Sequence, residues 1–125
     1  RNIDVRIIAP ALSDIFFIPL LSRTYYKNLL KQGVIIYEYQ PAILHAKLLL
    51  IDQQCMIGST NFNHRSFHHD LELDIVLHHP DSINEIEQYL LSDMNASTII
   101  SVDVLKKHRL QLFLSRFFRL FRYWL

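Results

Sequence analysis

The sequence predicts an α/β domain in which strands and helices pack around a hydrophobic core. Half of the 125 residues are hydrophobic and only 20% are charged, so apolar burial can offset the conformational entropy of folding. Short apolar or alternating segments, typical of strands, are separated by segments with helical periodicity. Glycine occurs only 2 times, which excludes collagen-like and glycine-rich low-complexity chains. The length fits one domain.

The first strand is expected almost at the start of the chain. Residues 3–8 alternate between apolar and polar side chains and are followed by Pro10, which ends the strand. Because a strand needs neighbours or a protected edge, we expect the chain to be part of a longer protein. A helix is expected over residues 22–32, with Ser22 as its N-cap and Gly33 directly after its last turn.

The remaining elements continue the alternation, in the order β-α-β-β-β-β-α, which indicates an α/β sheet domain. Further strands are expected over residues 34–39, 44–51, 55–57 and 71–77. The nearly unbroken apolar run of residues 44–51 is typical of a strand buried on both faces. A helix is expected from Pro80 to about Leu91, followed by a polar linker over residues 92–98.

Charge divides the chain into an acidic body and a basic end. Residues 1–103 contain all 12 Asp and Glu, whereas residues 104–125 contain cations and no acid. We therefore predict a domain over 1–103 and a basic amphipathic helix over 104–125. Its apolar stripe consists of Leu110, Phe113, Leu114, Phe117, Phe121 and Trp124. Such a helix suits a membrane interface rather than a crossing, and the alternative is a helix that closes the core or docks on another half of the protein.

Several chemistries are not expected from the composition. The single cysteine, Cys55, excludes an internal disulfide and a Cys-based zinc site, and it fits a reducing compartment. His64 and His68 have the i, i+4 spacing of some metal ligands, but we interpret them as solvated loop residues and predict no metal and no cofactor. The acidic body argues against nucleic acid as a partner, because that affinity rests on phosphate neutralisation.

A group of polar residues interrupts the predicted strands. On a strand, residues i and i+2 share a face, so His45 and Lys47 point together, which would be costly in an apolar segment without a polar role. Ser59 and Asn61 share one side of a turn, where a hydroxyl and an amide can donate to an anion. Glu72 lies on the polar face of its strand and could orient an imidazole. The group predicts a phosphate site with a nucleophile.

Asp52 and Arg65 are further polar residues near this group in the sequence. Asp52 lies an odd number of residues from His45, so on a regular strand it faces the other way, and we interpret it as anchoring the strand end. Arg65 either contacts the phosphate or ties down its own loop.

The motif formed by these residues resembles that of the phospholipase D superfamily. The pattern is His-x-Lys-x-x-x-x-Asp, then Gly-Ser-x-Asn, then a glutamate, and it is matched by His45, Lys47, Asp52, Gly58, Ser59, Asn61 and Glu72. Within the superfamily the chain resembles the C-terminal half of a bacterial cardiolipin synthase. The resemblance implies a mixed β-sheet flanked by helices. It also implies catalytic roles for His45, Lys47, Asp52 and Glu72, and phosphate contacts from Lys47, Ser59, Asn61 and Arg65.

The resemblance implies phosphatidyl transfer between phospholipids through a phosphohistidine intermediate. His45 would serve as general acid/base or as nucleophile, and a second motif would come from an upstream half or from a second copy. The expected substrate is a phosphatidylglycerol-like lipid. The chain would lie on the bacterial inner membrane, bound at its surface through residues 106–125. The alternatives are a homodimeric phosphodiesterase or nuclease, a phospholipase D hydrolase, or an inactive lipid-binding fragment.

Overall fold

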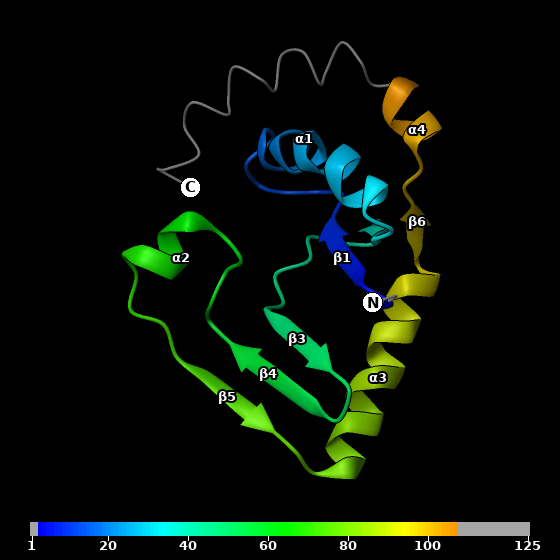
Figure 1. The fold of residues 1–125 in the computed structure, drawn as a ribbon. Coiled ribbons are helices and arrows are strands. Elements are labelled where there is room, and N and C mark those ends of the chain that lie inside the picture. Colours follow the sequence, from blue (N-terminus) through cyan, green and yellow to red (C-terminus); the bar gives the residue numbers. More distant parts are fainter. Residues whose placement is uncertain (1–2, 108–125) are drawn as a thin grey trace. The chain divides into compact units, whose positions relative to one another are not determined.

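The computed structural model describes residues 3–107, which form a mixed α/β structure with two three-stranded sheets (Figure 1). These residues divide into two compact units. One unit contains residues 3–44 and 93–107, and the other contains residues 45–92. The α/β class expected from the sequence is confirmed, with the strands shared between two sheets.

The first unit is a β-α-β arrangement extended by a late strand. Strand β1 (Arg6–Pro10) runs parallel to β2 (Ile35–Tyr39), and α1 (Ile18–Lys31) connects them (Figure 1). Strand β6 (Ser97–Ile99) pairs antiparallel with the other edge of β2, and α4 (Val102–Lys107) follows it. A core forms where α1 and α4 pack, and its buried members are Tyr26, Ile36, Ile100 and Leu105.

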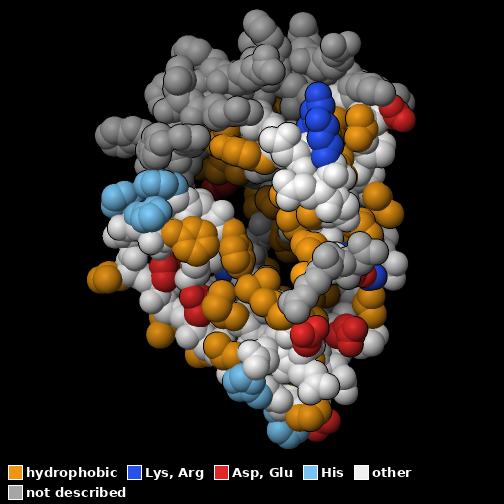
Figure 2. Space-filling model, in the orientation of Figure 1, with side chains coloured by type: hydrophobic (Ala, Val, Ile, Leu, Met, Phe, Trp, Pro, Cys, Tyr) orange, Lys and Arg blue, Asp and Glu red, His pale blue; other side chains and the backbone are white. Residues whose placement is uncertain are grey.

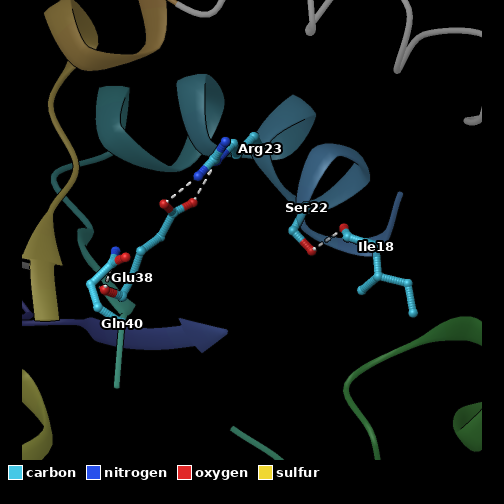
Figure 3. Close-up of polar contacts among 5 residues, drawn as sticks. All are labelled: Ile18, Ser22, Arg23, Glu38 and Gln40. Carbon is cyan, nitrogen blue, oxygen red and sulfur yellow. Dashed lines mark hydrogen bonds and ion pairs between the residues drawn. The ribbon is translucent and has the colours of Figure 1, made fainter. Parts of the chain in front are cut away.

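A buried ion pair holds α1 against β2. Arg23 on α1 donates two hydrogen bonds of 2.7 Å each to the two carboxylate oxygens of Glu38 on β2 (Figure 3). The Glu38 side chain is only 3% exposed. Burial and the neighbouring Glu38 carboxylate also raise the pKa of Tyr26 above its usual range, so its phenol stays neutral.

The second unit is an antiparallel sheet in the order β3-β4-β5. Strand β3 (Leu48–Ile51) and β4 (Gln54–Gly58) form a hairpin, and β5 (Asp74–Leu77) pairs with the other side of β4. The short helix α2 (His64–His68) lies in the β4–β5 connection (Figure 1). Helix α3 (Pro80–Asn95) follows β5, and its last turn belongs to the first unit.

Several expectations about the elements were wrong in detail. Helix α1 begins at Ile18, four residues before the predicted cap, and the Ser22 hydroxyl donates to the Ile18 carbonyl inside the helix at 3.1 Å (Figure 3). Residues 92–98 are not a linker, because α3 continues to Asn95 and β6 begins at Ser97. Strands β3 and β5 begin at Leu48 and Asp74, so His45, Lys47 and Glu72 precede these strands rather than lying on them. Strand β3 is also not buried on both faces, since Ile51 is exposed. The predicted element order also omitted α2 and β6, and α4 begins at Val102, two residues before the helix expected over residues 104–125.

Gly33 has φ +84° directly after α1, in the left-handed region where glycine is favoured, as expected of a residue that ends a helix. Within residues 3–107, every helix falls short of the length and apolarity needed to cross a bilayer. The predicted apolar stripe from Leu110 to Trp124 lies outside the described residues.

Candidate active site

The sheet of the second unit brings three motif segments to one edge. The Lys47 carbonyl accepts a hydrogen bond from the Gly58 N–H at 3.2 Å, which continues the β3–β4 ladder to the residue before β3. Gly58 in turn pairs with Asp74 at the start of β5. The entrance to β3, the end of β4 and the entrance to β5 therefore lie side by side. These segments contain His45 and Lys47, then Ser59 to Asn61, then Glu72.

His45 and Lys47 point toward each other, as the i, i+2 spacing predicts. The Nζ atom of Lys47 lies 2.8 Å from Nε2 of His45 and donates to the His45 carbonyl at 3.0 Å. Because an ammonium group has only donors, Nε2 accepts this bond and carries its lone pair toward Lys47. The imidazole is exposed, so an incoming anion can reach both groups.

Ser59 and Glu72 form the second pair of the site. The Ser59 hydroxyl donates to Oε2 of Glu72 at 2.6 Å and accepts the Leu73 N–H at 2.9 Å. The Ser59 N–H also donates to the Leu73 carbonyl at 3.1 Å. The single proton of the Ser59 hydroxyl is therefore directed at Glu72. For Ser59 to donate to a phosphate oxygen as expected, its hydroxyl must rotate away from Glu72.

Thr60 and Asp74 add a contact that the sequence analysis missed. The Thr60 hydroxyl and N–H both donate to the Asp74 carboxylate. This carboxylate packs over Gly58, where an added Cβ would lie 2.6 Å from the Asp74 Cα and nearer still to the Leu73 carbonyl. Glycine is therefore needed at position 58 because the start of β5, which pairs beside it, approaches too closely for a side chain. The pairing of Gly58 with Asp74 is a tertiary feature that no local pattern indicates.

The Asn61 backbone is fixed by α2. Its N–H donates to the hydroxyl of Ser66, which is buried, at 3.2 Å. Asn63 caps the short helix, because its side-chain oxygen accepts the Ser66 N–H at 2.8 Å. Asn is among the residues favoured at an N-cap, so this cap could have been found from the sequence.

Arg65 is paired within its own loop, and Asp52 lies at the far end of β3 from Lys47. Arg65 donates to Asp70 at 2.9 Å, which closes the α2 loop and raises the pKa of the guanidinium. Asp52 occupies the two-residue turn between β3 and β4, with φ 50°. Since strands rise about 3.3 Å per residue, Asp52 lies roughly 16 Å from Lys47 along β3. The structure therefore brings the segments that carry His45, Lys47, Ser59, Asn61 and Glu72 to one edge of the sheet, with Asp52 at the opposite end.

The grouped side chains can hold and attack a phosphodiester. An ammonium group and a side-chain amide offer donors to phosphoryl oxygens, and an imidazole offers a nucleophile or an acid/base. Within residues 3–107, no group of three or more His, Cys, Asp or Glu side chains is arranged to hold a metal ion.

Comparison with known proteins identifies the family that carries this arrangement. The family model described as "Cardiolipin synthase, PLD-like domain" matches residues 1–94. The chain belongs to this family. The cardiolipin synthase PLD-like domain thus covers the first unit's β-α-β arrangement and the whole sheet that carries the motif. The resemblance inferred from the motif is confirmed at the level of the family.

Curated relatives of this PLD-like domain are bacterial. The chain is 38% identical to "Cardiolipin synthase 2" of Bacillus anthracis over 110 residues, covering 87% of the chain and 21% of that protein. It is 34% identical to "Cardiolipin synthase" of Geobacillus sp. (strain WCH70) over 112 residues, covering 89% of the chain and 22% of that protein. It is 33% identical to "Cardiolipin synthase A" of Pseudomonas syringae pv. syringae (strain B728a) over 103 residues, covering 82% of the chain and 22% of that protein.

The chain therefore spans about a fifth of the length of the curated relatives it matches. No solved structure matched the chain.

Proposed function

We propose that this PLD-like domain supplies one half of a phosphatidyltransferase site that makes cardiolipin-like lipids. The observation that carries the proposal is the contact of Lys47 with His45 at the same sheet edge as the Ser59–Glu72 pair. The family match and the names of the relatives support it. The substrate class is a phosphatidylglycerol-like phospholipid.

The bond between Lys47 and His45 suggests how substrate binding starts the reaction. In the free protein the lone pair of Nε2 is engaged by the Lys47 ammonium at 2.8 Å. A phosphodiester oxygen carries a negative charge and is the stronger partner for an ammonium group. Lys47 therefore turns to the phosphate, which frees Nε2 of His45 for chemistry at phosphorus or at the reacting oxygen. Asn61 provides a further donor to the phosphoryl oxygens.

The reaction proceeds in two displacements at phosphorus. One imidazole attacks phosphorus, the bond to the first alcohol breaks, and the second imidazole gives that alcohol its proton. The second imidazole then takes the proton of the acceptor alcohol, whose oxygen attacks phosphorus and releases the first imidazole. His45 fills one of these roles. The other imidazole comes from a second motif, carried by an upstream half or by a second copy of the chain.

Glu72 acts in this scheme as an orienting carboxylate. Its position is set by the Ser59 hydroxyl, and its other carboxylate oxygen is available to an imidazole N–H of the second half. Asp52 has a supporting role, since its left-handed turn sets the β3–β4 register on which the Lys47 to Gly58 bond depends.

The basic segment favours a location on the surface of the bacterial inner membrane. Residues 106–125 contain six Lys and Arg and several aromatic side chains. Each cation near an anionic leaflet contributes about 1 kcal/mol to binding. The segment would hold the domain against its lipid substrate.

The test is a transfer assay with phosphatidylglycerol vesicles. The chain is assayed alone and with an upstream half supplied as a separate polypeptide. His45→Ala abolishes cardiolipin formation without changing the circular dichroism spectrum, whereas His78→Ala, an exposed imidazole after β5, retains it. Activity that survives His45→Ala contradicts the proposal.

A further inference from the structure

Exposed hydrophobic side chains surround α2 beside the candidate active site. Phe62 and Phe67 are 60% and 61% exposed, and their rings contact each other edge to face at 6.3 Å. Leu71 is 103% exposed and Leu73 is 77% exposed. We call these four side chains the α2 surface. Figure 2 shows hydrophobic side chains next to the imidazoles that gather over α2.

Local hydrogen bonds fix the orientation that leaves these side chains exposed. Ser66 turns inward to accept the Asn61 N–H, so its neighbour Phe67 faces outward on a helix of 5 residues. In the extended segment before β5, Glu72 turns toward Ser59. Since successive side chains of an extended chain alternate, Leu71 and Leu73 point away from Ser59.

The α2 surface is continuous with the residues that would hold the lipid phosphate. Phe62 directly follows Asn61, and Leu71 and Leu73 flank Glu72. In a phospholipid, the phosphate is joined through glycerol to the acyl chains. A lipid whose phosphate reaches the site therefore brings its glycerol and acyl region to side chains within a few residues of it.

The acidic side chains of this region are engaged by neighbouring groups of the fold. The carboxylate of Asp70 is paired with Arg65, and that of Glu72 accepts a hydrogen bond from the Ser59 hydroxyl. The imidazoles of His64, His68 and His69 lie together, with ring centroids 4.4 to 6.3 Å apart. Phenylalanine and leucine side chains beside a polar face are typical of protein segments that lie at a membrane interface.

We propose that the α2 surface inserts into the headgroup boundary of a phospholipid bilayer and seats the domain over its substrate. This inference rests on the proposed function, which supplies the lipid. It assigns the docking contact to the folded domain, in addition to the basic segment over residues 106–125.

Vesicle co-sedimentation of the full chain tests the proposal. Vesicles contain phosphatidylglycerol and phosphatidylcholine, and the variant is Phe62→Ser/Phe67→Ser/Leu71→Ser. Partitioning falls about tenfold for each inserted side chain that is lost. Tyr89→Ser removes an equally exposed aromatic ring from α3 and leaves partitioning unchanged. If the triple variant binds vesicles as well as Tyr89→Ser, the α2 surface does not dock on lipid.

A fluorescence measurement reports insertion directly and keeps the proposal testable if the triple variant fails to fold. Phe67→Trp is placed in a Trp124→Phe background, so the introduced indole is the chain's single tryptophan. Its emission shifts to the blue and is quenched by brominated lipids. Unchanged emission on vesicle binding overturns the proposal. The proposal is also overturned if the triple variant loses self-association and still binds vesicles, because the α2 surface would then contact a second copy of the chain.

The two experiments separate this inference from the proposed function. Vesicle binding does not require turnover, so His45→Ala binds vesicles as the parent chain does. Loss of cardiolipin formation in His45→Ala with unchanged vesicle binding in the triple variant refutes the docking surface alone. Insertion of the indole without any transferase activity refutes the proposed function alone.

Discussion

The buried ion pair between Arg23 and Glu38 gives a quantitative test of the fold of the first unit. In Arg23→Met, the aliphatic stem is kept and the guanidinium is removed. The Glu38 carboxylate, 3% exposed, then loses both of its 2.7 Å hydrogen bonds to Arg23. A buried charge that loses its partner destabilises a protein by about 3–5 kcal/mol. A typical domain is stable by only about 5–15 kcal/mol, so the loss is a large fraction of the total.

A second substitution separates the loss of the pair from the loss of packing. In Arg23→Met/Glu38→Leu the uncompensated charge is gone, and replacement of a buried ion pair by apolar side chains of similar volume is often neutral. We therefore expect the double variant to regain most of the stability that Arg23→Met loses.

Urea denaturation followed by circular dichroism measures these free energies of unfolding. Arg6→Met is the control, because it removes an ion pair with Asp4 in which both side chains are exposed, and it leaves stability unchanged within error. If Arg23→Met changes stability no more than Arg6→Met does, the pair is not buried as described. If the double variant is as unstable as Arg23→Met, the missing guanidinium acts through packing rather than charge.

Three further predictions concern the second unit and the basic segment. Gly58→Ala places a Cβ against the Leu73 carbonyl and Asp74, so it lowers the free energy of unfolding by about 1–3 kcal/mol. Adding Asp74→Ala does not restore the lost stability, because the Leu73 carbonyl remains. A melting temperature of Gly58→Ala equal to that of the parent chain contradicts this prediction. Burial raises the pKa of the Cys55 thiol, so at neutral pH a thiol reagent labels it only in urea; rapid labelling of the native chain contradicts this. Deletion of residues 106–125 weakens sedimentation with anionic vesicles, and unchanged sedimentation refutes an anchoring role.

Local patterns predicted the elements whose signals are local. Gly33 ends α1 because its positive φ suits glycine, and the β-branched and aromatic run before Tyr39 forms β2. The start of α1 was missed because Ser22 resembles a cap, whereas its hydroxyl bonds back to Ile18 within the helix. Strand β6 was missed because Ser97 to Ile99 is short, and it forms a strand only by pairing with β2.

In the candidate site, too, contacts between residues close in sequence were predictable, and contacts that depend on strand pairing were not. The contact between His45 and Lys47 follows from a spacing of two residues in extended chain, so the sequence sufficed for it. The bonds from Ser59 to Glu72 and from Thr60 to Asp74 join residues 13 and 14 positions apart. They depend on the register between β4 and β5, which hydrophobic patterning leaves open. The inward turn of Ser66 likewise depends on how α2 folds back on Asn61.

Titration of the full chain with inorganic phosphate tests the central claim most directly, since it requires neither the second half nor turnover. The nitrogen resonances of the His45 imidazole are followed by nuclear magnetic resonance. The account predicts that phosphate draws Lys47 away from Nε2, so the Nε2 signal of His45 shifts saturably, and that Lys47→Met removes the shift. A His45 signal that phosphate leaves unmoved, or moves no more than that of the exposed His78, would contradict a phosphate site built on this pair.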